Sequence, residues 1–149
     1  MALREYEFYH GAALARLVSI AKTVRVARLD EIGSGCYALD EKIGTLIKYA
    51  TDRLTPWAFT FTAEHKQTLS VLRARYSEVL VLLVCRDDGI VALDYQSTIL
   101  LIGEGSTTAS VSVARRPRQM YSVSGTYGVV ARKLGDADYA KQLLGPANK

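Results

Sequence analysis

Cysteine and histidine are scarce in this chain of 149 residues. It has two cysteines, Cys36 and Cys85, and two histidines, His10 and His65. The cysteines show no Cys-x-x-Cys spacing and no neighbouring histidine pair, whereas a structural zinc site takes four such ligands. The sequence therefore excludes a structural zinc site, and it favours two buried thiols over a disulfide.

Long hydrophobic runs are also missing. The longest apolar run covers residues 79–85, far fewer than the ~20 residues that a transmembrane helix needs. Residues 1–7 mix charged and aromatic side chains and lack the apolar stretch of a secretory signal. We therefore expect a cytoplasmic protein that does not enter a membrane.

Familiar catalytic and nucleotide-binding patterns are absent as well. The segment Gly33-Ser34-Gly35 lacks the spacing and the following helix of a nucleotide-binding fingerprint. No Ser-His-Asp or Cys-His arrangement is apparent. His10 and His65 are each expected at the start of a helix, where a structural role is the more common one.

The composition is that of an ordinary globular protein. Apolar residues make up 49% of the chain and charged residues 23%, and the length suits one core, so we expect a single domain over residues 1–149. The net charge is +4. So small an excess indicates an anionic partner only where the cations cluster.

Hydrophobic periodicity predicts helices and strands in mixed order. Helices are predicted over residues 10–22, 63–76 and 95–102, the second capped by Thr62 and the third by Asp94. Strands are predicted over residues 24–29, 36–39, 43–50, 57–62, 79–84, 90–93, 109–114, 119–123 and 129–133. The run 79–84 has no polar alternation, which predicts burial on both faces. The fold class is therefore α/β, in the α+β sense of a mixed sheet with helices on it.

The predicted order over residues 10–93 resembles the core of the PD-(D/E)XK, or restriction-endonuclease-like, fold. In that family a helix precedes a β-meander, and a second helix and a buried strand follow; the remaining strands here would form a C-terminal β extension. Residues 43–49, 55–61, 80–85 and 88–90 also resemble an uncharacterised family of small bacterial proteins.

The resemblance to PD-(D/E)XK nucleases implies a Mg²⁺-dependent site. In that family an Asp on one strand and the Glu of a Glu-x-Lys on the next hold Mg²⁺, and the Lys orients the attacking water. Asp40 lies where the metal-binding Asp is expected, and Lys48 where the Lys is expected. Leu46 stands in place of the Glu, so the motif is incomplete. The missing carboxylate could come from Glu41 or Asp52, and Glu7 could assist; Asp40 and Lys48 should then approach each other beside a second acidic group.

Both candidate residues also have simpler interpretations. Asp40 falls within Asp40-Glu41-Lys42, where Asp favours a hairpin turn. Lys48 lies between Ile47 and Tyr49 on a predicted strand and could simply point to solvent. A Lys48 that is partly buried beside a carboxylate would favour the functional interpretation.

The densest cationic cluster is Arg115-Arg116-Pro117-Arg118. Three guanidinium groups with Tyr121 nearby suit contact with phosphates and stacking on a base, so we expect DNA or RNA as the partner. Arg132 and Lys133, on the next predicted strand, could extend this surface. A solvated turn is the plain alternative.

Two other classes of function stay open. The chain could be a non-catalytic assembly subunit, and a homodimer could form if residues 110–113 lie at a sheet edge. It could also sense a nucleotide or another small molecule, which a thermal shift with nucleotides but not with oligonucleotides would indicate.

Overall fold

The computed structural model describes residues 2–135. Its helices are α1 (Glu5–Ala21), α2 (Ala63–Arg75) and α3 (Tyr95–Ile102). Its strands are β1 (Val26–Arg28), β2 (Cys36–Leu39), β3 (Ile43–Ala50), β4 (Trp57–Phe61), β5 (Glu78–Cys85), β6 (Gly89–Asp94), β7 (Ala109–Ala114) and β8 (Ser122–Gly125). The predicted mixed α/β class is confirmed, with the strands divided between two sheets.

The larger sheet has five strands in the order β1-β2-β3-β5-β6. Its two longest strands, β3 and β5, run parallel, and the other pairs are antiparallel. From Val79 to Cys85 every residue of β5 is buried, as its continuous apolar run predicts. The parallel pair brings the ends of β3 and β5, at Ala50 and Cys85, to the same side of the molecule.

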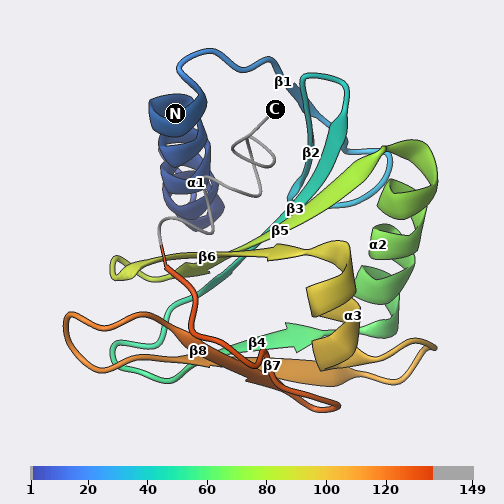
Figure 1. Ribbon diagram of the computed structural model, residues 1–149. Helices are drawn as coiled ribbons and strands as arrows, with labels where there is room; N and C mark the ends of the chain where they lie inside the picture. Colours follow the sequence, from blue (N-terminus) through green and yellow to red (C-terminus); the bar gives the residue numbers. More distant parts are fainter. Residues whose placement is uncertain (1, 136–149) are drawn as a thin grey trace, which may run out of the picture.

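Helix α1 covers one face of the larger sheet (Figure 1). Its inward side chains Ala13 and Leu17 are fully buried against Leu39, Ile47 and Leu82. The helix starts five residues earlier than predicted, because the Glu7 carboxylate accepts a hydrogen bond from the Arg4 backbone N–H at 2.8 Å and caps the first turn. Glu7 therefore caps the helix.

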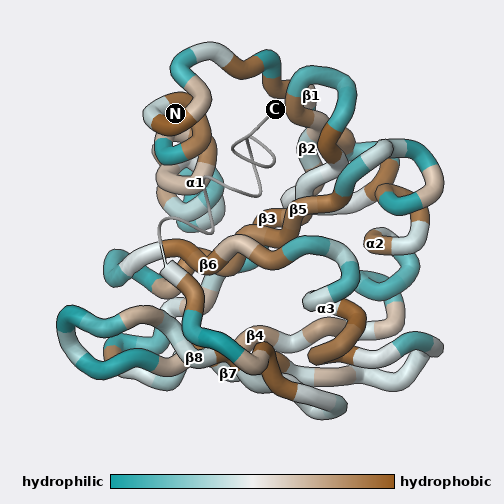
Figure 2. The backbone as a smooth tube through the Cα atoms, viewed as in Figure 1, coloured by the Kyte–Doolittle hydropathy of each residue, from teal (hydrophilic) through white to brown (hydrophobic). Residues whose placement is uncertain are grey.

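The opposite face of the larger sheet carries α2, α3 and the smaller sheet, ordered β4-β7-β8 (Figure 1). One hydrophobic core joins these elements, with Phe61, Leu69, Val81 and Val111 among its fully buried members. In Figure 2 apolar residues follow β3 and β5 through the centre, whereas polar residues gather in the connecting loops.

Several predictions of strand pairing are corrected by the structure. β4 leaves the strands that precede it and pairs with β7. Because β7 lies between β4 and β8, residues 110–113 are not at a sheet edge. The strand predicted at 119–123 is displaced to Ser122–Gly125, and the strand predicted at 129–133 reduces to isolated bridges at Val129 and Leu134.

Within residues 2–135, no helix is long and apolar enough to cross a membrane. The weakly patterned tail that the sequence shows after Gly135 lies outside the described residues.

Candidate functional site

Asp40 occupies the turn between β2 and β3 and holds that turn against β1. Its Oδ1 accepts the Arg25 backbone N–H at 2.8 Å, and its own N–H donates to the Arg25 carbonyl at 2.8 Å. Asp40 and Glu41 both have positive φ, 52° and 58°, a conformation that Asp tolerates in tight turns. Both bonds and both angles fit the turn interpretation of Asp40.

Lys48 lies near the other end of β3. The strand rises ~3.3 Å per residue, so the five steps from Ile43 to Lys48 separate it from the Asp40 turn by ~16 Å. Asp40 and Lys48 do not meet, and the structure corrects the expectation that they approach each other. No group of three or more His, Cys, Asp or Glu side chains in residues 2–135 is placed to hold a metal ion.

The carboxylates considered as replacements do not form a metal site with Asp40 and Lys48. Glu41 is exposed in the β2–β3 turn. Asp52 stabilises the loop before β4, where its Oδ2 accepts the Ala58 N–H at 3.2 Å and its backbone carbonyl accepts the Trp57 indole N–H at 3.0 Å. Neither completes a site with Asp40.

Lys48 instead faces α2, beside His65. Its Nζ lies 3.4 Å from His65 Nδ1 and 3.5 Å from Nε2, and 5.0 Å from the centre of the Phe61 ring. Nearly equal distances to both ring nitrogens place the ammonium against the imidazole rather than in line with one lone pair. The surrounding pocket, of about 380 Å³, is also lined by His10, Tyr6 and Tyr49. Among the described residues that line this pocket there is no carboxylate.

The pocket disfavours positive charge. Desolvation lowers the pKa of Lys48 to about 8. Desolvation, followed by the neighbouring Lys48 charge, lowers the pKa of His65. The Thr62 backbone N–H donates to His65 Nδ1 at 3.0 Å, so the neutral imidazole carries its proton on Nε2. Lys48 is thus an amine that loses its proton more easily than an exposed lysine.

The arginine cluster folds as a loop between β7 and β8, and we define residues 115–121 as the arginine loop. Arg115 donates from Nε to Asp88 Oδ2 at 2.7 Å and from Nη2 to Asp88 Oδ1 at 2.9 Å. The Tyr121 hydroxyl donates to the same Oδ2 at 2.6 Å, and the Arg115 guanidinium lies 5.0 Å from the Tyr121 ring centre. These contacts fix the base of the loop.

Arg115 and Tyr121 therefore have structural roles that the sequence did not reveal. The side chains of Arg115 and Asp88 are only 26% and 27% exposed, and Tyr121 is 7% exposed. Burial, followed by the hydrogen bond to Asp88, raises the pKa of Tyr121. A buried tyrosine covered by a guanidinium is not available to stack on a base, so we no longer assign that role to Tyr121.

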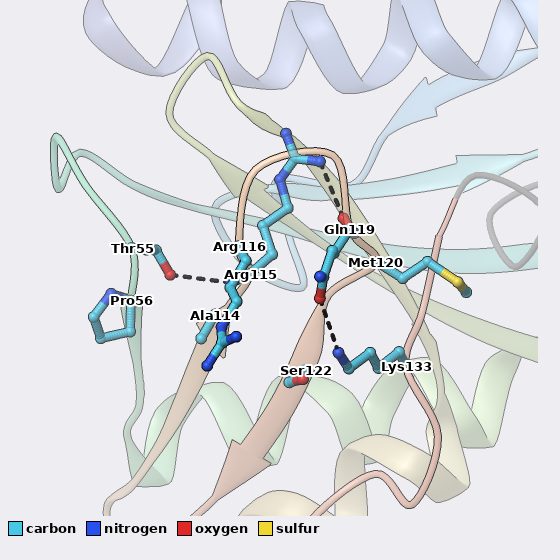
Figure 3. A pocket seen from close by; sticks show the side chains of 9 residues that line it. All are labelled: Thr55, Pro56, Ala114, Arg115, Arg116, Gln119, Met120, Ser122 and Lys133. Carbon is cyan, nitrogen blue, oxygen red and sulfur yellow. Dashed lines mark hydrogen bonds between the residues drawn. The ribbon is translucent and has the colours of Figure 1, made fainter.

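A groove of about 450 Å³ runs beside the arginine loop (Figure 3). Arg115, Arg116 and Lys133 line it together with Thr55 and Gln119. Three hydrogen bonds tie its walls: Arg115 N–H to Thr55 Oγ1 at 3.1 Å, Arg115 Nη1 to the Gln119 carbonyl at 3.2 Å, and Lys133 Nζ to Gln119 Oε1 at 3.2 Å. Lys133 thus reaches the arginine loop, as predicted, although not from a strand.

The other predicted cations lie on the same side of the molecule. Arg116 and Arg118 are exposed, and Arg118 sits in the turn with a positive φ of 65°. Arg132, next to Lys133, is exposed but is not among the residues that line the groove. Arg86, in the β5–β6 turn, donates to the Thr51 carbonyl at 2.8 Å, so three loops meet at this end of the molecule (Figure 1).

Sequence reasoning missed His65 as the neighbour of Lys48 and Asp88 as the partner of Arg115. The position of His65 at the start of a helix was predicted, but its contact with Lys48 spans 17 residues, and the Arg115–Asp88 pair spans 27. A single sequence has no local signal for either contact. No family model, curated protein or solved structure matches the chain.

Proposed function

We propose that this chain binds nucleic acid through the arginine loop and the groove beside it. The observation that carries the proposal is the exposure of Arg116 and Arg118 on a loop whose base is fixed by the Arg115–Asp88–Tyr121 contacts. Lys133 lines the groove together with Arg116 and adds a third cation to this surface. Several guanidinium and ammonium groups held together suit successive phosphates of a nucleic-acid backbone.

The fixed base favours binding because less conformational freedom is lost when the backbone docks. Arg115 itself contributes little net charge, since Asp88 neutralises it at hydrogen-bonding distance. The contacts would therefore be made mainly by Arg116, Arg118 and Lys133. Contacts of this kind go to phosphates and position the polymer without reading its sequence.

Cleavage is a separate part of the proposal. The order α1, β1 to β4, α2, β5 supports the resemblance to a restriction-endonuclease-like core at the level of element succession, although β4 joins the smaller sheet. It supports in the same measure the proposal of a Mg²⁺-dependent endonuclease. The separation of Asp40 and Lys48 weakens the catalytic part. We therefore propose binding as the primary activity, and a Mg²⁺-dependent reaction would need ligands other than this pair.

The test is a titration of fluorescent single- and double-stranded DNA and RNA with the wild-type protein and the Arg116→Ala/Arg118→Ala variant. We expect the variant to bind about tenfold more weakly at low salt, because two phosphate contacts are lost. Fluorescence anisotropy gives the Kd, and gel analysis with and without Mg²⁺ detects cleavage.

The matched control is Lys42→Ala/Arg75→Ala. It removes the same charge, but Lys42 precedes β3 and Arg75 ends α2, both at the opposite end of the sheet from the arginine loop. If both variants weakened nucleic-acid binding equally, the loss of net charge alone would explain the effect. No binding by the wild type at low salt would contradict the proposal.

A non-catalytic assembly subunit is the second candidate, and α1 supplies the observation that favours it. Phe8 and Val18 are 60% and 47% exposed on the outer side of this helix. Between them Gly11, Ala12 and Ala15 are also exposed and have small side chains. An apolar helix face of this kind suits packing against another helix at close distance.

We propose a second copy of the chain as the occupant of this face. Glu5 and Glu7 lie at the start of α1 and Lys22 at its end. Two α1 helices packed antiparallel about a twofold axis would bring the acidic start of one beside the basic end of the other. Charge complementarity of this kind supports a homodimer rather than an unrelated partner.

A further inference from the structure

A third pocket, of about 460 Å³, lies between α2, α3 and the loop that follows α3. Ser70 and Lys66 reach it from α2, Tyr95 from α3, and residues 103–106 from the loop. Arg73 lies 5.4 Å from the centre of the Tyr95 ring and packs against that wall. The pocket is at the Ala109 end of β7, whereas the arginine loop follows the Ala114 end, so the two sites are separated by the length of the strand.

Lys66 is the unusual residue of this pocket. Its side chain is only 6% exposed, and among the described residues its Nζ has no hydrogen-bond partner. The one contact of the ammonium that the structure shows is the Tyr127 ring, whose centre lies 5.7 Å away. An ammonium group has three N–H donors, and burying it without an anion or acceptors is costly. The Lys66 ammonium therefore lacks the anion or the acceptor oxygens that a buried ammonium requires.

The loop opposite Lys66 has the chemistry that an anion needs. Its sequence is Gly103-Glu104-Gly105-Ser106, and both glycines have positive φ, 72° and 94°. A Cβ built on Gly105 meets no atom within 4 Å, so a ligand can approach the backbone there. Ser70 and Ser106 offer hydroxyl groups on two sides of the pocket.

The arrangement of donors around the pocket suits a phosphoryl group. Lys66 and Glu104 are the charged residues that line it, and Glu104 is exposed and forms no ion pair with Lys66 within residues 2–135. The N-terminal residue of α2, Ala63, also lines the pocket, and the start of a helix is attractive to anions. The donors come from several directions, which suits a tetrahedral anion with oxygens on every side.

We propose that Lys66, Ser70 and the loop of residues 103–106 bind the phosphoryl group of a small molecule, either inorganic phosphate or a phosphomonoester. Lys66 provides the charge, the hydroxyl groups of Ser70 and Ser106 provide directed donors, and Gly105 gives the phosphate access to the backbone. Tyr95 forms an aromatic wall against which the rest of a phosphomonoester can lie. This site is separate from the proposed nucleic-acid surface and does not depend on it.

The test is thermal unfolding at constant ionic strength with inorganic phosphate, adenosine 5′-monophosphate, adenosine or chloride. We expect phosphate, the monophosphate or both to raise the Tm of the wild type by a few degrees in a saturable manner, and adenosine and chloride to leave it unchanged. A shift with phosphate indicates the free anion as the ligand, and a shift with the monophosphate alone indicates a phosphomonoester. Lys66→Met, which keeps the apolar stem, should abolish the shift.

Two further variants keep the proposal falsifiable if Lys66→Met does not fold. Glu104→Gln removes the carboxylate from the rim and should make the Tm rise at lower phosphate concentrations, while Arg116→Ala should leave the response unchanged. Equal shifts in the wild type and Lys66→Met, a shift with adenosine equal to that with the monophosphate, or no shift at all would overturn the proposal. So would a Glu104→Gln variant that loses stability without phosphate, because Glu104 would then be the partner of Lys66.

Discussion

At the scale of single residues, Asp88 accepts three of the hydrogen bonds that fix the arginine loop. Two come from Arg115 and one from the Tyr121 hydroxyl. Desolvation works to raise the pKa of Asp88, but the bonds from Arg115 and Tyr121 outweigh it and hold the pKa below the ordinary value of 3.8. The carboxylate is thus ionised wherever the protein is folded near neutral pH.

Asp88→Asn should destabilise the protein by about 1–2 kcal/mol in urea unfolding at pH 7, because Arg115 and Tyr121 lose the charged acceptor that they share. The effect stays modest because the Arg115–Asp88 pair is partly exposed to solvent. Because the folded pKa of Asp88 is lowered, its contribution is complete above pH ~3.8 and is lost as the pH falls below that value. The matched control is Asp87→Asn, since Asp87 is exposed in the same turn. Equal unfolding free energies for the two variants would contradict this role.

Lys48 should make stability rise with pH in the alkaline range. Its folded pKa is about 8 and its ordinary value 10.5, so between these values the unfolded chain holds a proton that the folded protein has released, and raising the pH favours folding. Below pH 8 Lys48 is protonated in both the folded and the unfolded chain, so the full free-energy cost of burying the ammonium opposes folding. Lys48→Met should therefore stabilise the protein at pH 7 by about 1–2 kcal/mol and flatten the rise above pH 8, as measured by urea unfolding. A variant with an unchanged slope, or one less stable at pH 7, would refute this assignment.

At the scale of elements, the outer face of α1 makes a prediction about assembly. Phe8→Glu places a charge at one end of the apolar face, on its largest exposed side chain, and should convert a homodimer into a monomer in light scattering at micromolar concentration. Leu54→Glu is the control, because Leu54 is 79% exposed in the loop before β4. A wild-type protein that is monomeric at high concentration would exclude the α1 dimer.

The elements with strong local signals were predicted from the sequence. β2, β3, α3 and β7 have their predicted bounds, because alternation, capping by Asp94 and the turn at residues 40–42 are encoded in adjacent residues. The sheet partner of β4 was not predictable in this way, because its pairing with Val111 and its neighbours joins residues more than 45 positions apart. Propensity also failed at residues 129–133, where only Val129 forms an isolated bridge.

In the candidate site, too, features encoded by neighbouring residues were predicted and long-range contacts were not. The sequence indicated that Arg116 and Arg118 lie in an exposed turn and that Lys133 lies near them, and both features are present. Asp40 and Lys48 were brought together only by the family resemblance, and the register of β2 with β3 separates them. Contacts such as Lys48 with His65 depend on how α2 packs on the sheet, which a single sequence does not encode locally.

At the scale of the whole molecule, the two proposed sites occupy opposite ends of the smaller sheet. β7 leads from the glycine-containing loop beside Lys66 to the arginine loop. The two ends carry different chemistry. The buried Lys66 ammonium at one end suits a small anion, and the exposed guanidinium groups of Arg116 and Arg118 at the other end suit a polymer. Small-molecule binding and nucleic-acid binding can therefore be measured separately with variants that affect only one end.

The most direct test of nucleic-acid binding by the arginine loop is the salt dependence of the affinity for a short DNA duplex. Each phosphate contact contributes about 0.9 to the slope of log K against log salt concentration. We expect Arg116→Ala/Arg118→Ala to reduce that slope by about 2 relative to the wild type, and Lys42→Ala/Arg75→Ala to leave it unchanged. Identical slopes for the wild type and the arginine-loop variant would contradict the account.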